Sequence, residues 1–145
     1  MKDRGFFIIL KKNMETRDTH VLELRGETFG TITNQSSSEE VFQNKTLRPI
    51  LKLQNDLLVQ VFINYSVKQK NVFFTLTPEK KMAYIENVLQ RDIKFRNSLK
   101  GMIIAFFTLD EYAEYIQNSS NLNKRMMNML AERLKSQIQV MDVNS

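Results

Sequence analysis

The chain has 145 residues, of which 42% are hydrophobic and 26% are charged, a composition typical of one globular domain with a sizeable core. It contains no cysteine, which excludes disulfides, thiolate nucleophiles and cysteine-based metal sites. A histidine-based metal site or catalytic triad would have to rest on the single histidine, His20. These absences favour a binding protein over an enzyme, and we expect no catalytic residue, no cofactor and no metal site.

The net charge of +5 is unevenly spread along the chain. Three of the five net positive charges fall in residues 1–13, MKDRGFFIILKKN, whose apolar run Phe6–Leu10 is too short for a signal peptide or a membrane span. We predict that residues 1–13 are a disordered leader and that residues 14–145 form a single helical domain. In the absence of another targeting signal, we expect a cytoplasmic protein that does not contact membranes.

The first periodic segment, Thr16–Arg25, is ambiguous. It can form a short helix closed by Gly26 in the left-handed position, and the TFGTIT that follows can form a short extended piece. A clearer helix start lies at Ser37, because Glu40 three residues later completes the pattern of a capping box.

The first long helix is predicted from about Ser38 to about Val67. At about 100° per residue, eight apolar side chains form one arc: Phe42, Leu47, Ile50, Leu51, Leu53, Leu57, Leu58 and Val61. The opposite arc is polar and contains Arg48, Lys52, Asn55 and Asp56. Pro49 has no N–H to donate to the Lys45 carbonyl, so we predict a kink there, or two helices that meet at Arg48. The Lys45 carbonyl then needs water or another cap.

A second long helix is predicted from Pro78 to Phe107, because Thr77 is a good cap residue and proline is favoured at the first helical position. On this helix Asp92 and Arg96 fall at the centre of an apolar stripe. The two side chains are four residues apart, with the acid first, which allows them to pair across one turn.

Two shorter helices complete the pattern. Thr108 and Glu111 predict a capping box that starts an acidic helix to about Asn118. A last helix, capped by Ser119 or Ser120, carries apolar residues at helical spacing: Leu122, Met126, Met129, Leu130, Leu134 and Ile138. The sequence therefore predicts an all-α fold, a small bundle of four to five helices with an irregular N-terminus.

Asp92 and Arg96 form the first candidate site, with Gln54 as a third member because its amide lies on the core face of the first long helix. One interpretation is a buried ion pair that fixes how the helices pack. The other is a pocket in which Arg96 binds an anionic ligand and Asp92 orients the guanidinium. Catalysis by Asp92 is disfavoured, because a neighbouring arginine lowers the pKa of a carboxyl group, which is the wrong direction for a general acid.

A basic surface is the second candidate. Its members would be Arg91 and Lys94, with Lys100, from one helix and Lys124 and Arg125, with Arg133 and Lys135, from the last helix. Such a cluster is either a solvated surface or a nucleic-acid interface, and the sequence contains no recognisable nucleic-acid motif. The methionines of the last helix belong to its core face or to an adaptable protein-binding surface.

Three stretches, FQNKTLRPILKLQNDLL, RDIKFRNSLKGMII and LNKRMMNML, resemble a family of small uncharacterised bacterial α-helical proteins. The resemblance covers about Phe29 to Gln137 and implies an all-helical fold without an established activity. Some members are labelled "glyoxalase", which would imply a lyase-type enzyme. The metal site of true glyoxalase I proteins uses His and Glu side chains on strands, and it is not carried over to this chain.

The sequence thus leads us to expect a binding protein whose partner is a protein or a small anionic ligand. Nucleic-acid binding and a lyase-type enzyme are the alternatives.

Overall fold

The computed structural model describes residues 16–26 and 36–141, and it contains no strand within these ranges. The predicted all-α class is confirmed. Six α-helices lie wholly within the described residues, against the four to five predicted, because each of the two predicted long helices is divided. The predicted leader, residues 1–13, lies outside the described residues.

Residues 16–25 form a helix that ends at Gly26, as the first of the two interpretations predicted. Gly26 has a φ of +73°, the left-handed conformation that glycine adopts without strain. Its N–H donates to the Leu22 carbonyl at 3.2 Å and so closes the last turn. The TFGTIT segment that was predicted to be extended lies outside the described residues.

The first long helix is divided into α2 (Ser38–Phe42), the π-helix η1 (Gln43–Leu47) and α3 (Arg48–Lys68). The Ser37 hydroxyl accepts from the Glu40 N–H at 3.1 Å, which confirms Ser37 as the cap residue. The prediction that two helices meet at Arg48 is also confirmed, because α3 starts there and Pro49 occupies its first turn. The Arg48 N–H donates to the Gln43 carbonyl, five residues back, which is the bond of a π-helix.

This π-turn explains an error in the predicted core face of α3. One extra residue in a turn leaves the following side chains about 100° behind their positions in a continuous α-helix. Leu53 and Leu57, predicted to be in the apolar arc, are exposed, whereas Phe62 and Ser66 are buried. The same rotation half-buries Asn55, which was predicted to lie on the polar arc.

The second long helix is also divided, into α4 (Pro78–Arg91) and α5 (Ile93–Ile104), so the prediction of one continuous helix is wrong. Asp92 lies between them with a ψ of 87° and caps α5, its carboxylate accepting from the Phe95 N–H at 3.0 Å. Aspartate competes with the helix in this way, because its side chain bonds to nearby backbone N–H groups. The 3₁₀-helix η2 (Val72–Thr75) connects α3 to the Thr77 cap of α4.

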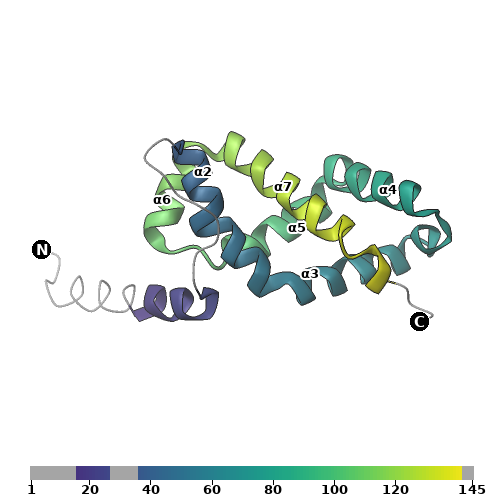
Figure 1. Ribbon diagram of the computed structural model, residues 1–145, viewed down its shortest axis with the longest axis horizontal. Helices are drawn as coiled ribbons and strands as arrows, with labels where there is room; N and C mark the ends of the chain where they lie inside the picture. The colour runs from purple at the N-terminus through teal and green to yellow at the C-terminus, as the bar shows by residue number, and fades with distance from the viewer. Residues whose placement is uncertain (1–15, 27–35, 142–145) are drawn as a thin grey trace, which may run out of the picture.

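The predicted capping box of Thr108 and Glu111 is confirmed, and it starts α6 (Leu109–Gln117). The last helix, α7 (Ser119–Lys135), has Asn118 at its N-cap, so the prediction of a Ser119 or Ser120 cap is wrong. The 3₁₀-helix η3 (Ile138–Val140) follows α7. Figure 1 shows α7 crossing α5, with α2 and α6 near its start and α4 near its end. None of the described helices has the length and apolar content needed to cross a membrane.

The core lies between these crossing helices. Its largest fully buried side chains come from most of the elements: Phe42, Phe62, Phe73, Phe107, Leu47, Ile50, Leu51, Leu58, Ile85, Leu99, Ile103 and Leu122. Aromatic rings connect them, with Phe42 edge-on to Phe107 at 5.4 Å and Phe62 edge-on to Phe73 at 5.1 Å between centroids.

A buried ion pair joins the N-terminal helix to this core. Arg25 donates through Nη1 to Glu111 Oε1 at 2.5 Å and through Nη2 to Glu111 Oε2 at 2.9 Å. Arg25 Nη2 also donates to the Lys45 carbonyl at 3.0 Å, so the carbonyl that Pro49 leaves without its usual helical partner is capped, as predicted. The Thr46 hydroxyl completes the network by donating to Glu111 Oε2 at 2.6 Å.

Candidate functional site

The structure does not bring the first set of predicted site residues together. Asp92 accepts from the Tyr65 hydroxyl at 2.6 Å, and Arg96 donates to the Gln90 carbonyl at 3.2 Å. Gln54 donates to the Met102 carbonyl at 3.1 Å and so links α3 to α5. The predicted ion pair of Asp92 and Arg96 is therefore wrong, because the helix break at Asp92 turns its carboxylate toward α3.

The acceptor role of Asp92 affects two pKa values. The hydrogen bond from Tyr65, followed by that from the Phe95 N–H, lowers the pKa of the Asp92 carboxyl group. Burial, followed by the bond to Asp92, raises the pKa of the Tyr65 hydroxyl. Both shifts favour the ionised carboxylate with a protonated tyrosine, which is the state of a stable cap.

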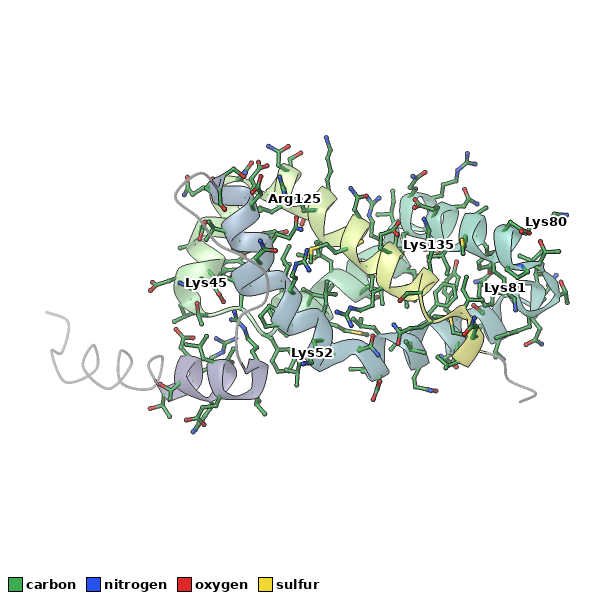
Figure 2. All side chains as sticks on the ribbon, viewed as in Figure 1. Lys45, Lys52, Lys80, Lys81, Arg125 and Lys135 are labelled. Atoms are coloured by element: carbon green, nitrogen blue, oxygen red, sulfur yellow. The ribbon has the colours of Figure 1, made fainter. Side chains whose placement is uncertain are left out.

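The predicted basic surface is divided between different parts of the molecule. Two grooves border α7, one beside α3 and the other beside α4 and α5. Arg91 and Lys94 flank the junction of α4 and α5, and they line neither groove. Arg125 lines one of these grooves and Lys124 lines the other. Figure 2 shows Arg125 near the start of α7, beside α2, and Lys135 at the other end of the helix.

The larger groove runs between α3 and α7, and we call it the α3–α7 groove. It has a volume of about 880 Å³, within the range of about 300–1,000 Å³ usual for small-molecule sites. Its lining residues come from η1, α3, α7 and the turn after α7: Gln43, Arg48, Leu51, Asn55, Arg125, Asn128, Met129, Glu132, Arg133, Ser136 and Gln137.

Two arginines give this groove its charge. Neither Arg48 nor Arg133 has an ion-pair partner among the described residues, and the Arg133 guanidinium donates to Asn55 Oδ1 at 3.2 Å. Burial of Arg133, followed by the nearby charge of Arg48, lowers the pKa of the Arg133 guanidinium below its usual value. The two cations therefore repel each other in the free protein.

Two carboxylates at this groove are already engaged in ion pairs, and Asp56 accepts from Asn55 Nδ2 at 3.1 Å. Glu132 is at the rim, with a side chain 74% exposed, and pairs with Lys135 at 3.3 Å. Glu39 pairs with Arg125 at 3.3 Å. Arg125 also donates to Gln43 Oε1 at 2.8 Å, which fixes its side chain along one end of the groove.

An amide pair positions Arg133. Asn55 Nδ2 donates to Gln137 Oε1 at 2.7 Å, and Gln137 Nε2 donates back to Asn55 Oδ1 at 2.7 Å. The Gln137 amide also donates to the Arg133 carbonyl at 2.9 Å, so the end of α7 is tied to the middle of α3. Asn55 Oδ1 is thereby directed at the Arg133 guanidinium, whose remaining N–H groups stay available for a ligand.

Sequence reasoning placed Arg133 in a general basic surface, and it missed Arg48, Asn55 and Gln137. Arg48 and Asn55 were assigned to the solvent face of α3, because the rotation introduced by η1 has no simple sequence signal. Pro49 next to Arg48 was the available clue, since it disturbs the helix at the point where the groove begins.

Within the described residues, no group of three or more His, Asp or Glu side chains is placed to hold a metal ion.

Comparisons with protein-family models, with curated proteins and with solved structures found no match to this chain. The resemblance to small bacterial helical proteins therefore stays a prediction.

Proposed function

We propose that this chain is a binding protein that holds an anionic ligand, through a phosphate or carboxylate group, in the α3–α7 groove. The observation that carries the proposal is the pair Arg48 and Arg133, two cations in one groove that have no ion-pair partner within residues 16–26 and 36–141. In the proposed complex the anionic group of the ligand lies between the two guanidinium groups and offsets their repulsion.

The chemistry of the lining suits an anion of moderate size. A guanidinium binds phosphate and carboxylate oxygens in a bidentate fashion, with two parallel N–H···O bonds. Arg48 and Arg133 supply the charge, and the amides of Asn55, Asn128 and Gln137 supply neutral donors and acceptors beside it. Leu51 and Met129 provide the apolar part of the surface.

The amide pair also gives the site preorganisation. Because the Asn55 and Gln137 amides bond to each other and to Arg133, less side-chain freedom is lost when a ligand binds. Arg48 is exposed and lies in the first turn of α3, so it can close on the ligand from the opposite wall of the groove.

Thermal unfolding with two anions at matched ionic strength tests this proposal. A ligand that binds the folded state at 100 times its Kd stabilises it by about 2.7 kcal/mol. We expect pyrophosphate to raise the Tm of the wild type above its value in chloride. The variants Arg48→Gln and Arg133→Gln should lose most of this difference.

Arg91→Gln is the matched control, because it removes one arginine charge outside the groove. It should keep the wild-type response to pyrophosphate. Equal melting temperatures in the two salts, or an Arg91→Gln variant that loses the response as fully as Arg48→Gln, would contradict the proposal.

A further inference from the structure

A second groove lies on the other flank of α7, between this helix and α4 and α5, and we call it the α4–α7 groove. It has a volume of about 490 Å³. Arg96, Lys100 and Lys124 line it, and none of the three has an ion-pair partner among the described residues. Its one acid, Glu86, is bound by Lys135.

The two grooves have the same chemistry. Both linings consist mainly of Arg, Lys, Ser, Asn and Gln, the side chains that contact phosphates and sugars in nucleic-acid complexes. In the α4–α7 groove these are Gln90, Ser120 and Asn123 in addition to the three cations. Asn128 lines both grooves, so they meet across the exposed ridge of α7.

This arrangement suits a ligand that carries anionic groups into both grooves. A single exposed ion pair contributes little to the binding free energy. When one chain occupies both sites, the second contact becomes intramolecular, and the overall affinity can rise by about 10²–10⁴-fold. A polyanion that crosses α7 neutralises the cations of both grooves at once.

We propose that the two grooves together bind one nucleic-acid strand by its phosphodiester backbone, with the strand crossing α7 at Asn128. The inference rests on the proposed function of the α3–α7 groove and names its ligand class. Neither groove lining contains an aromatic side chain, so base stacking does not contribute and binding is independent of sequence. The same lack of aromatic anchors disfavours an acidic polypeptide, since protein interfaces are centred on such residues.

Fluorescence anisotropy with a labelled 20-nucleotide oligouridine tests the inference. We expect the double variants Arg48→Gln/Arg133→Gln and Arg96→Gln/Lys124→Gln each to weaken binding at least about tenfold. Each should also reduce the salt slope by about 1.4, because a contact to a single strand contributes about 0.7. Lys68→Gln/Lys80→Gln removes the same charge from exposed lysines outside both grooves and should bind within about twofold of the wild type; Figure 2 shows Lys80 at the end of the molecule far from Arg125.

The outcomes separate this inference from the proposed function. If Arg96→Gln/Lys124→Gln binds like the control while the pyrophosphate response persists, the inference fails and the α3–α7 site stands. If the pyrophosphate response is absent too, both fail. The same titration with duplex RNA and with single-stranded DNA shows which kind of nucleic acid supplies the phosphodiester backbone. Polyglutamate that binds as tightly as the RNA, or no measurable binding of any nucleic acid, overturns the assignment.

Discussion

The guanidinium of Arg25 holds three segments of the chain together. It bonds to Glu111 at the start of α6, to the Lys45 carbonyl in η1 and, at 3.3 Å, to the Phe106 carbonyl. A buried ion pair of Asp92 and Arg96 was one of two interpretations of the sequence, and the structure has a buried pair instead between two residues 86 positions apart. Glu111 was predicted only as a capping residue, and in the structure it both caps α6 and pairs with Arg25.

At the residue scale, Arg25→Ala should be strongly destabilising. The change leaves the Glu111 carboxylate without its charge partner in a buried setting, and losing one member of a buried pair costs about 3–5 kcal/mol. Urea unfolding at pH 7 measures the loss. Arg17→Ala is the control on the same helix, because Arg17 also donates to backbone carbonyls but has a side chain 42% exposed. A cost for Arg25→Ala no greater than that for Arg17→Ala would refute the assigned role.

The same network predicts a pH dependence. Burial of Glu111 opposes its ionisation, but the hydrogen bonds from Arg25, Thr46 and the Thr108 N–H outweigh it and lower the pKa of this carboxyl group from its ordinary 4.5. A lowered pKa in the folded state contributes stability that is fully present above about pH 4.5 and is lost as the pH falls through the folded value.

Glu111→Gln should therefore be less stable than the wild type at pH 7, and the gap should narrow as the pH falls toward 3. Urea unfolding of both proteins across this pH range measures the gap. Parallel curves for wild type and variant would show that ionised Glu111 does not stabilise the fold in the manner described.

At the scale of elements, local rules predicted helix starts well and helix continuity poorly. The caps at Ser37, Thr77 and Thr108 depend on a few neighbouring residues, and all three are confirmed. The π-turn η1 and the break at Asp92 depend on distant partners. Arg25 caps the free carbonyl in η1, and the Tyr65 hydroxyl holds the Asp92 carboxylate.

Because of the break between α4 and α5, we expect unequal losses of stability when Asp92 and Arg96 are each replaced by alanine. Asp92→Ala removes the cap of α5 and the partner of Tyr65, and loss of such a cap costs about 0.5–2 kcal/mol. Asp92→Asn keeps an oxygen that can cap α5, so this variant should retain most of the stability that Asp92→Ala loses. Arg96→Ala, a half-exposed side chain bonded to one carbonyl, should stay within about 0.5 kcal/mol. Equal losses for Asp92→Ala and Arg96→Ala in urea unfolding would instead support the buried pair.

At the scale of the whole molecule, the sequence predicted the all-α class but not which helices form the two grooves. Arg96, predicted in one interpretation to line a pocket, does line the α4–α7 groove, but without Asp92 or Gln54. Helical spacing and caps are local properties, so they indicate which faces of each helix are apolar. A groove depends on which polar faces meet. Arg48 and Arg133 are 85 positions apart in the printed sequence, and only the crossing of α3 and α7 brings them to one site.

The pairing of the nearby acids is equally a property of the assembled surface. Glu39, Glu86 and Glu132 are all near the cations of α7, but each is paired with Arg125 or Lys135. The groove cations left without an ion pair among the described residues are Arg48 and Arg133 in one groove and Arg96, Lys100 and Lys124 in the other. Net charge alone does not reveal this distribution.

An anion held between Arg48 and Arg133 can be detected by ¹⁵N NMR of the arginine and amide side chains during a pyrophosphate titration. We expect saturable shifts of the Arg48 and Arg133 Nε resonances and of the Asn55 and Gln137 side-chain amides, with little change at Arg91. Shifts centred on Arg91, or unchanged Arg48 and Arg133 resonances at saturating pyrophosphate, would contradict it.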